Sequence, residues 1–490
     1  MKGIMQRIGQ KNSRIVKVAV TGIFGLLLSG CTVVGPDYVQ PETRAPEKWS
    51  TSLAGGLSPE AMDPQKMASW WTTLHDPRLT SLIQRAVAGN LDLRKARARV
   101  REARARRGIA AADRFPTINT EGTVSKIGTS QELGGGADIE LYGAGFDANW
   151  ELDLFGGVQR AVEAADAELA ASHEELRDVM VSLLAEVGLN YVELRSFQTR
   201  LSIAKANQKA QEETCNITRA RAASGVTSEL DVEQARYNLE QTRSQIPPLQ
   251  RGVEQAGNRL AVLLGKNPGS LKDELIEMQP IPVTPLEVAV GLPADALRRR
   301  PDVRRAEQQL VAQTARIGVA TAYLYPKFKL AGSIGLISLS SGNFFSDASR
   351  SYSVGPQFYW NVFDSGRIRQ NIEVQNALQE QALISYEASV LLALEEVENA
   401  LIAYADEQVR RRSLVEAAGA AGRAVQLAED QYSSGLIDFQ NVLNAQRALL
   451  SLQDQLATSD GAVTSNLIRL YKALGGGWTP AEAAAPSAQK

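Results

Sequence analysis

The chain contains two copies of one sequence pattern, separated by a constant offset of 210 residues. Each copy is therefore large enough to hold several helices and strands, unlike a solenoid repeat of about 20–50 residues. Identical residues recur at this offset along most of the chain: Asp92 and Asp302, Arg94 and Arg304, Pro116 and Pro326, Trp150 and Trp360, Gly156 and Gly366, Ser224-Gly225 and Ser434-Gly435, Leu264-Gly265 and Leu474-Gly475. Any fold for this chain must be built from two similar units.

Each copy begins with a helical segment and continues with a β-hairpin. The helical segments, Asp76–Arg114 and Pro285–Leu324, end before Pro116 and Pro326, since proline disfavours helix at the preceding residue. Between Ala144 and Leu154 apolar and polar residues alternate with period two, which predicts a strand with one apolar and one polar face. Loops rich in glycine and serine join the extended stretches into hairpins at about 115–155 and about 325–363.

Long charged runs of 67 residues follow the hairpins. Their apolar residues recur with gaps of three and four, which is typical of a coiled-coil seam. Both runs end at Ser-Gly, a helix C-terminal signal, and shorter return helices follow. The first repeat is therefore expected at 76–268, with long and return helices at 157–223 and 228–264. The second repeat is expected at 286–477, with the corresponding helices at 367–433 and 438–474. A linker at 269–285 joins the repeats, and residues 478–490 are expected to be a disordered tail.

The N-terminus has the features of a secreted, anchored chain. Residues 1–30 combine basic residues with the apolar run Val18–Leu28, which predicts a signal peptide. A helix of that run would be about 16 Å long, too short for a hydrocarbon core of ~30 Å. Leu28-Ser29-Gly30-Cys31 resembles the bacterial lipobox, so we expect Cys31 to carry a covalent lipid anchor, and residues 31–75 to be extended.

The composition argues against enzymes and nucleic-acid binders. The net charge of −2 gives no reason to expect nucleic acid as a partner. His173-Glu174 is followed by Arg177, so the spacing of a zinc-binding helix fails. We therefore expect no catalytic residue, no metal and no cofactor except the lipid on Cys31. The run Arg298-Arg299-Arg300 is expected to be a solvated helix face.

Four strands with one apolar face cannot close on themselves. In a membrane, an open four-stranded sheet would leave edge groups unpaired at several kcal/mol each. Since the smallest single-chain barrels have eight strands, the chain must share strands with copies of itself. Two copies would give a filled barrel and three would leave room for water, but the residues alone leave the number open. The alternative is a lipid-anchored periplasmic coiled-coil scaffold or adaptor without a pore.

Several motifs stand in a fixed order along the chain: Gly35-Pro36-Asp37-Tyr38, Trp70-Trp71, Trp150–Gly156, Arg299-Arg300-Pro301-Asp302-Val303 and Trp360–Gly366. Together they resemble the TolC-like outer-membrane efflux factors, in the NodT-like lipoprotein branch. The resemblance covers Cys31–Trp478. It implies a mainly α fold with membrane β-hairpins, in which a trimeric twelve-stranded outer-membrane β-barrel is continued by a periplasmic α-helical barrel. It also implies a passive, non-enzymatic channel in the outer membrane that extends into the periplasm, and partners in a periplasmic membrane-fusion adaptor and a proton-driven inner-membrane pump.

The resemblance also indicates where a gate would lie. Helix turns into helix at the tip glycines Gly225 and Gly435, where the related channels close by an acidic and an apolar ring. Alignment places Asn444 at the usual acid and Gln440 at the usual apolar position. An asparagine ring would not concentrate cations as carboxylates do, so charge selection is expected at Asp231 or Asp438, or to be weak. For Asp438 a helix-capping role is the alternative. Trp150 and Trp360 are candidates for an aromatic belt at the membrane interface. The sequence does not identify the transported substrate.

Overall fold

The computed structural model describes residues 33–478 apart from 43–44, 62, 129, 131, 133–135, 137 and 286. The expected signal peptide, Cys31 and residues 479–490 of the expected tail lie outside the described residues. The contacts form two compact units, and each takes pieces from both repeats. The described residues of the first unit fall within Met1–Pro41, Val100–Ser172 and Ala306–Tyr386, and those of the second within Glu42–Arg99, His173–Arg305 and Glu387–Lys490. The division into 76–268 and 286–477 therefore does not coincide with the structural units.

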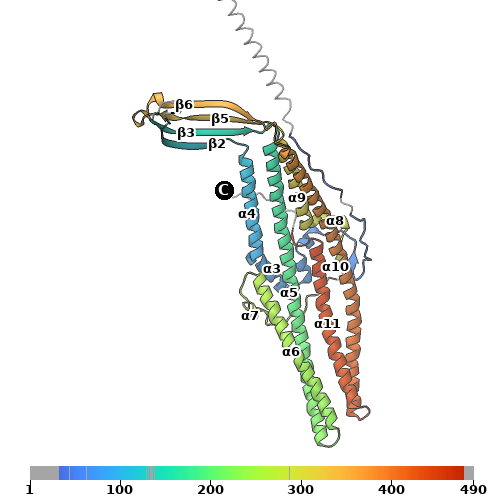
Figure 1. The fold of residues 1–490 in the computed structure, drawn as a ribbon. Helices are drawn as coiled ribbons and strands as arrows, with labels where there is room; N and C mark the ends of the chain where they lie inside the picture. The colour runs from blue at the N-terminus through green and yellow to red at the C-terminus, as the bar shows by residue number, and fades with distance from the viewer. Residues whose placement is uncertain are drawn as a thin grey trace, which may run out of the picture. The chain divides into compact units, whose positions relative to one another are not determined.

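The first unit contains one antiparallel sheet made from both hairpins. Its strand order is β2-β3-β5-β6, as Figure 1 shows. The strands are β2 (Thr117–Gly128), β3 (Asp138–Leu152), β5 (Lys327–Ser338) and β6 (Arg350–Tyr359). Two short 3₁₀ helices, η3 (Ser341–Asn343) and η4 (Asp347–Ser349), lie in the loop between β5 and β6. The two repeats thus meet at the β3–β5 pair in the middle of the sheet.

The helical segment before each hairpin is broken into two helices, contrary to the single helix expected in each copy. The first copy has α3 (Pro77–Gly89) and α4 (Leu91–Ala112), and the second has α8 (Pro293–Arg299) and α9 (Pro301–Ala322). At the first break, the Asn90 side chain accepts a hydrogen bond from Leu93 N and donates one to Leu263 O, both 2.9 Å long. At the second break, Pro301 keeps Arg300 out of the helical conformation.

The N-terminal segment is not extended throughout, as the sequence had suggested. It contains β1 (Leu57–Ser58), α2 (Pro64–Ala68) and the 3₁₀ helix η1 (Trp70–Leu74). β1 pairs in parallel with β4 (Val288–Ala289), and the expected linker contains the short helix α7 (Lys272–Leu275). The buried indole of Trp70 stacks on Tyr471 with ring centroids 5.7 Å apart, which explains why this segment folds back into a core.

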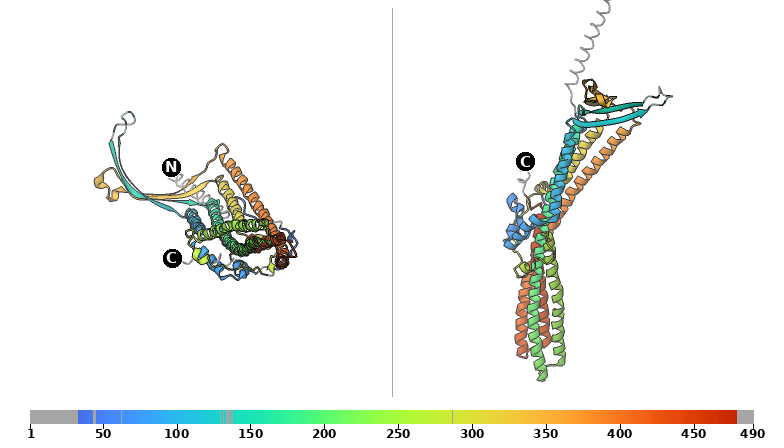
Figure 2. Two further views of the ribbon diagram at one scale, coloured as in Figure 1. Left: turned by 90° about the horizontal axis from the view of Figure 1, so that it is seen from below. Right: turned by 90° about the vertical axis from the view of Figure 1, so that its left-hand side faces the viewer.

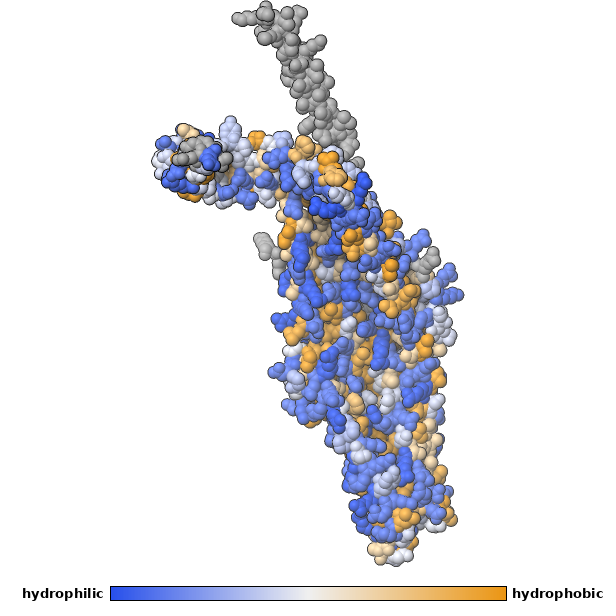
Figure 3. Space-filling view, viewed as in Figure 1, coloured by the Kyte–Doolittle hydropathy of each residue, from blue (hydrophilic) through white to orange (hydrophobic). Residues whose placement is uncertain are grey.

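The second unit contains paired long helices. α5 (Gly157–Ala223) and α10 (Arg367–Ser433) have 67 residues each, and α6 (Glu229–Leu263) and α11 (Phe439–Ala473) have 35 each. Two of them, α5 and α10, begin within the residues of the first unit. Figure 2 shows their turn-bearing ends side by side. Seam residues of both long helices belong to one buried apolar cluster: Val187, Tyr191, Leu194, Val397, Leu401 and Tyr404. In Figure 3, hydrophilic side chains cover most of the visible surface of this unit.

Among the described residues, no helix combines the length and the apolar character that crossing a membrane would require.

Two sequence expectations fail in the second unit. Trp478, assigned to the disordered tail, is buried, and the guanidinium groups of Arg177 and Arg304 lie 4.8 and 5.4 Å from its ring. Arg300, assigned to a solvated helix face, is also buried. Its guanidinium donates to the Ala473 carbonyl and to the carboxylates of Asp302 and Glu396. Arg298, by contrast, is exposed, because only Arg300 stands at the helix break.

Candidate channel wall and helix tips

The register of the sheet gives it one apolar and one polar face. Every paired position joins two odd-numbered or two even-numbered residues: Thr117 pairs with Asn149, Trp150 with Leu330, and Lys327 with Tyr359. Since directly opposite residues share a face, all odd-numbered strand residues lie on one face and all even-numbered ones on the other.

The even-numbered face is apolar and uncovered in the single chain. Tyr352 is 82% exposed and Ile334 65%. The uncovered apolar residues of this face are Ile118, Val124, Phe146, Trp150, Leu330, Ile334, Tyr352, Val354 and Phe358. Its charged residues, by contrast, all stand near the hairpin loops: Lys126, Asp138, Glu140 and Arg350. The strands have 10 to 15 residues, and a strand needs about 9–11 to cross a bilayer.

Both edges of the sheet are open within the described residues. β2 pairs only with β3, and β6 only with β5. A long edge strand presents a row of unpaired N–H and C=O groups that can pair with another chain. The sheet is therefore incomplete as a single copy.

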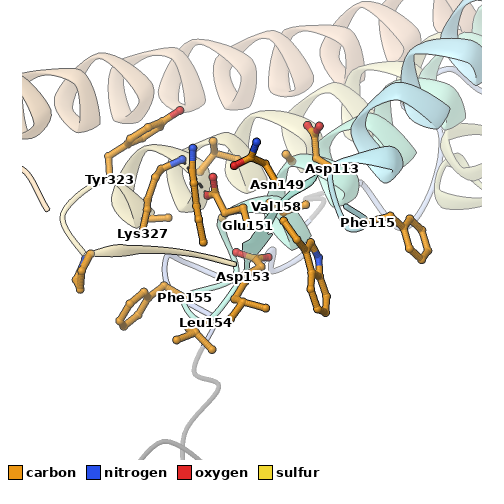
Figure 4. A pocket seen from close by; sticks show the side chains of 18 of the residues that line it. Asp113, Phe115, Asn149, Glu151, Asp153, Leu154, Phe155, Val158, Tyr323 and Lys327 are labelled. Carbon is orange, nitrogen blue, oxygen red and sulfur yellow. Dashed lines mark hydrogen bonds and ion pairs between the residues drawn. The ribbon is translucent and has the colours of Figure 1, made fainter. Parts of the chain in front are cut away.

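The polar face ends in a cavity at the root of the hairpins, shown in Figure 4. The cavity has a volume of about 420 Å³ and is lined by residues that include Asp113, Glu151, Tyr323, Lys327 and Lys329. Lys327 Nζ lies 3.0 Å from Glu151 Oε1 and 4.7 Å from the centre of the Tyr323 ring. This ion pair joins the two hairpins across the β3–β5 pair.

The two candidate belt tryptophans make the same contact in both repeats. Trp150 Nε1 donates to the Arg114 carbonyl over 2.9 Å, and Trp360 Nε1 donates to the Leu324 carbonyl over 3.0 Å. Each acceptor lies just after the helix that precedes the hairpin. The indoles therefore fasten each hairpin to its helix while their rings stay partly exposed. Their place in an interfacial belt remains a prediction.

The tip turns depend on glycine. Gly225 has φ +71° and Gly435 φ +73°, a left-handed conformation that glycine adopts without a Cβ penalty. The residues that follow close the turns, because Val226 N donates to Arg221 O and Leu436 N to Gln431 O, both over 2.9 Å. A Cβ at either glycine would meet no atom within 4 Å, so only backbone strain opposes a larger residue.

We expect Gly225→Ala or Gly435→Ala to destabilise its own tip by about 1 kcal/mol, through left-handed strain alone. Amide hydrogen exchange in the first turns of α6 and α11 would then accelerate about fivefold. Gly422→Ala, inside α10, is the matched control and should slow local exchange, because alanine favours helix by about 1 kcal/mol over glycine. Equal effects of all three variants would contradict this reading of the turns.

The gate candidate Asp231 has a structural role in its own chain. Its carboxylate accepts hydrogen bonds from the Thr227 hydroxyl and from the Ser228 hydroxyl and backbone N–H, forming a capping box at the start of α6. These hydrogen bonds hold the pKa of Asp231 below its usual range, and the bond from Thr227 has the largest effect. Asp231 therefore stays charged at neutral pH.

The other three gate candidates are exposed on α11. Asp438 stands at the N-cap position, but its side chain makes no capping hydrogen bond. Gln440 Nε2 donates to Asn444 Oδ1 over 3.1 Å, so these two amides lie one helical turn apart on the same face. The structure thus brings the side chains of Gln440 and Asn444 together. The Asp438 carboxylate does not cap the N-terminus of α11.

Comparison with known proteins decides between a channel and a scaffold. A sequence model described as outer membrane efflux protein matches residues 82–266 and 292–476. The chain belongs to the outer membrane efflux protein family. This efflux protein is 32% identical over 461 residues to nodulation protein T of Rhizobium leguminosarum bv. trifolii, covering 94% of this chain and 97% of that relative. It is also 32% identical over 462 residues to the solvent efflux pump outer membrane protein SrpC of Pseudomonas putida, covering 93% and 97%.

A solved structure of the outer-membrane channel OprN resembles this efflux protein with a TM-score of 0.86 and 38% identity, covering 91% of this chain and all of that one. The resemblance to NodT-like efflux factors is therefore confirmed. The protein is a channel of the outer membrane, and the scaffold alternative is not supported.

The charged residues on the polar face of the efflux protein's sheet are ones that the sequence reasoning passed over. Glu151 in β3 and Lys327 and Lys329 in β5 occupy odd-numbered positions and so lie on the polar face. That Glu151 lies opposite Lys329 becomes visible only with the register, because period-two alternation does not specify which residues pair.

Proposed function

We propose that three copies of the chain form one channel in the outer membrane. Four strands from each copy would give a twelve-stranded barrel in which β6 of one copy pairs with β2 of the next. The observation that carries this proposal is the sheet with two open edges and one uncovered apolar face. Pairing the edges satisfies their hydrogen-bonding groups, and lipid covers the apolar face. Twelve strands leave a lumen lined by the polar face, whereas eight would be filled by side chains.

The helices would continue this lumen through the periplasm as an α-helical barrel. α5 and α10 would run along the wall of this barrel as continuous helices, and the shorter helices would fill the rest of the wall. The duct is passive and not an enzyme, so a periplasmic membrane-fusion adaptor and a proton-driven inner-membrane pump supply cargo and energy. A lipid on Cys31 would anchor each copy to the outer membrane.

The tips carry the gate in this proposal. Gln440 and Asn444 present neutral amides there, while Asp438 offers an exposed carboxylate. The gate is therefore expected to close by crowding of side chains around Gly225 and Gly435, with a weak preference for cations from Asp438 and Asp231.

Ion conductance in planar lipid bilayers tests the proposed function. Purified protein should produce discrete conductance steps, and Asp438→Ala should change their frequency without abolishing them. Ser228→Ala, which removes the side-chain cap of α6, controls for a general loosening of the tip. Protein that inserts but never conducts, even with Asp438→Ala, would count against a channel.

A further inference from the structure

The polar face of the sheet carries opposite charges on its two hairpins. Its charged residues in β2 and β3 are Glu121, Asp147 and Glu151, all acidic. Its charged residues in β5 and β6 are Lys327 and Lys329, both basic. The first hairpin thus places three negative charges on this face, and the second places two positive ones.

The charges distinguish the two repeats residue by residue. The positions that correspond to Glu121, Asp147 and Glu151 at the offset of 210 are the uncharged Ala331, Gln357 and Asn361. The positions that correspond to Lys327 and Lys329 are Thr117 and Asn119. None of these five charges is therefore repeated in the other copy. At each equivalent position the other repeat has an uncharged residue.

The opposite charges meet at one seam only. Glu151 is directly opposite Lys329 in the register, and Lys327 Nζ lies 3.0 Å from its carboxylate. Figure 4 shows Glu151, Lys327 and Tyr323 on the same side of the hairpin root. Farther along the strands, neither Glu121 nor Asp147 forms an ion pair with any described residue, since Asp147 stands opposite Asn119 and Ser333. Much of the charge thus remains available to a solute.

In the barrel of the proposed function, on which this inference rests, first and second hairpins alternate around the wall. Acidic and basic sectors would then alternate around the lumen, and the field between them would run across the pore. A single charge attracted by one sector is repelled by the next, whereas a solute with separated positive and negative groups can satisfy both. At physiological salt the Debye length is about 8 Å, so such sectors act on solutes near the wall.

We propose that these five residues form a cargo-selective charge pattern that favours zwitterionic and strongly dipolar solutes. The acids bind the cationic end of the solute, and Lys327 and Lys329 bind the anionic end. The carboxylates of Asp438 and Asp231 at the helix tips can favour cations only, so the preference for solutes that carry both charges comes from the barrel wall.

The test uses variants that copy each repeat into the other. Lys327→Thr with Lys329→Asn leaves only the acids, and Glu121→Ala with Asp147→Gln and Glu151→Asn leaves only the lysines. From the reversal potential in a KCl gradient, the wild type should be weakly cation-selective. The first variant should raise the K⁺/Cl⁻ permeability ratio about threefold or more, and the second should invert the selectivity toward Cl⁻. With all five changes, liposome swelling by a zwitterionic amino acid, relative to an uncharged solute of the same size, should fall about threefold.

Channels that conduct with an unchanged permeability ratio and an unchanged swelling ratio would overturn the charge pattern and leave the channel itself intact. Absence of conductance in the wild type would instead overturn the proposed function. If a multiple variant does not reach the membrane, Lys329→Asn and Asp147→Gln alone should shift the permeability ratio in opposite directions, and shifts of the same sign would contradict the proposal.

Discussion

Ile334→Lys should remove most of the protein from the outer membrane. Ile334 lies on the apolar face of a central strand, pairs with Phe146 and Tyr352, and is 65% exposed in the single chain. A lysine facing lipid near the bilayer midplane costs about 2–4 kcal/mol, and a shared barrel would carry that cost once per copy. Separation of inner and outer membranes on a density gradient, followed by quantification of the chain, measures the effect.

Ser333→Lys is the matched control, because Ser333 is the neighbouring residue on the same strand but lies on the polar face. We expect this variant to reach the outer membrane at nearly the wild-type level, since its charge would face water. Equal loss of both variants would mean that lysine disturbs the strand itself. Wild-type levels of both would mean that the even-numbered face does not meet lipid.

Arg300→Ala should destabilise the second unit by about 2–4 kcal/mol. The Arg300 side chain is only 8% exposed and donates to Asp302 over 2.6 and 3.0 Å, to Glu396 over 2.7 Å and to the Ala473 carbonyl over 2.8 Å. Removing the guanidinium leaves the Asp302 carboxylate without its cation and the end of α11 without its hydrogen bond. The midpoint of urea unfolding, followed by the loss of helical circular dichroism, measures the change.

Arg298→Ala is the control, because the Arg298 side chain is 81% exposed. This substitution should lower the free energy of unfolding by less than about 0.5 kcal/mol. The effect of Arg300→Ala should also depend on pH. Burial is the largest single effect on the pKa of Asp302 and would raise it, but the hydrogen bond and the charge of Arg300, together with backbone hydrogen bonds, hold that pKa below its usual value. The pair therefore contributes its stability above the unfolded-state pKa of about 3.9 and loses it as the pH falls through the lower folded-state pKa. A difference between wild type and variant that stays constant down to pH 2 would contradict this assignment.

Most secondary-structure elements of the fold could be predicted from the sequence. The helix-forming runs, the hairpins and the tip turns could be predicted because each rests on local signals: period-two alternation near Trp150, gaps of three and four along α10, and glycine at Gly225 and Gly435. The break at Arg300 has a local signal in Pro301 that the single expected helix left out, since proline disfavours helix at the preceding residue. The break at Asn90 has no such proline, and its side chain is held by Leu263, 173 residues away. Trp478 was misassigned for the same reason, since the arginines that enclose its ring come from α5 and α9.

The site was less accessible to sequence reasoning than the fold. Asp231 stood out as a possible gate residue, yet its carboxylate completes a local capping box. Lys327 and Glu151 did not stand out, because their ion pair joins residues from different repeats. A charge on an alternating strand acquires meaning only when the register shows what lies opposite, and hydrophobic alternation does not specify the register of β3 against β5.

Disulfide crosslinking between strand edges tests the central claim most directly, that the open edges of one copy pair with those of another. Asn119→Cys on β2 is combined in turn with Ser351→Cys, Ser353→Cys and Gly355→Cys on β6, all on the polar face, and the chains are oxidised in isolated outer membranes. The account predicts that at least one combination gives covalent dimers and trimers on a non-reducing gel, while each variant with only one of the added cysteines, which keeps the buried Cys215, does not. Monomers in every combination, from protein that has reached the outer membrane, would contradict it.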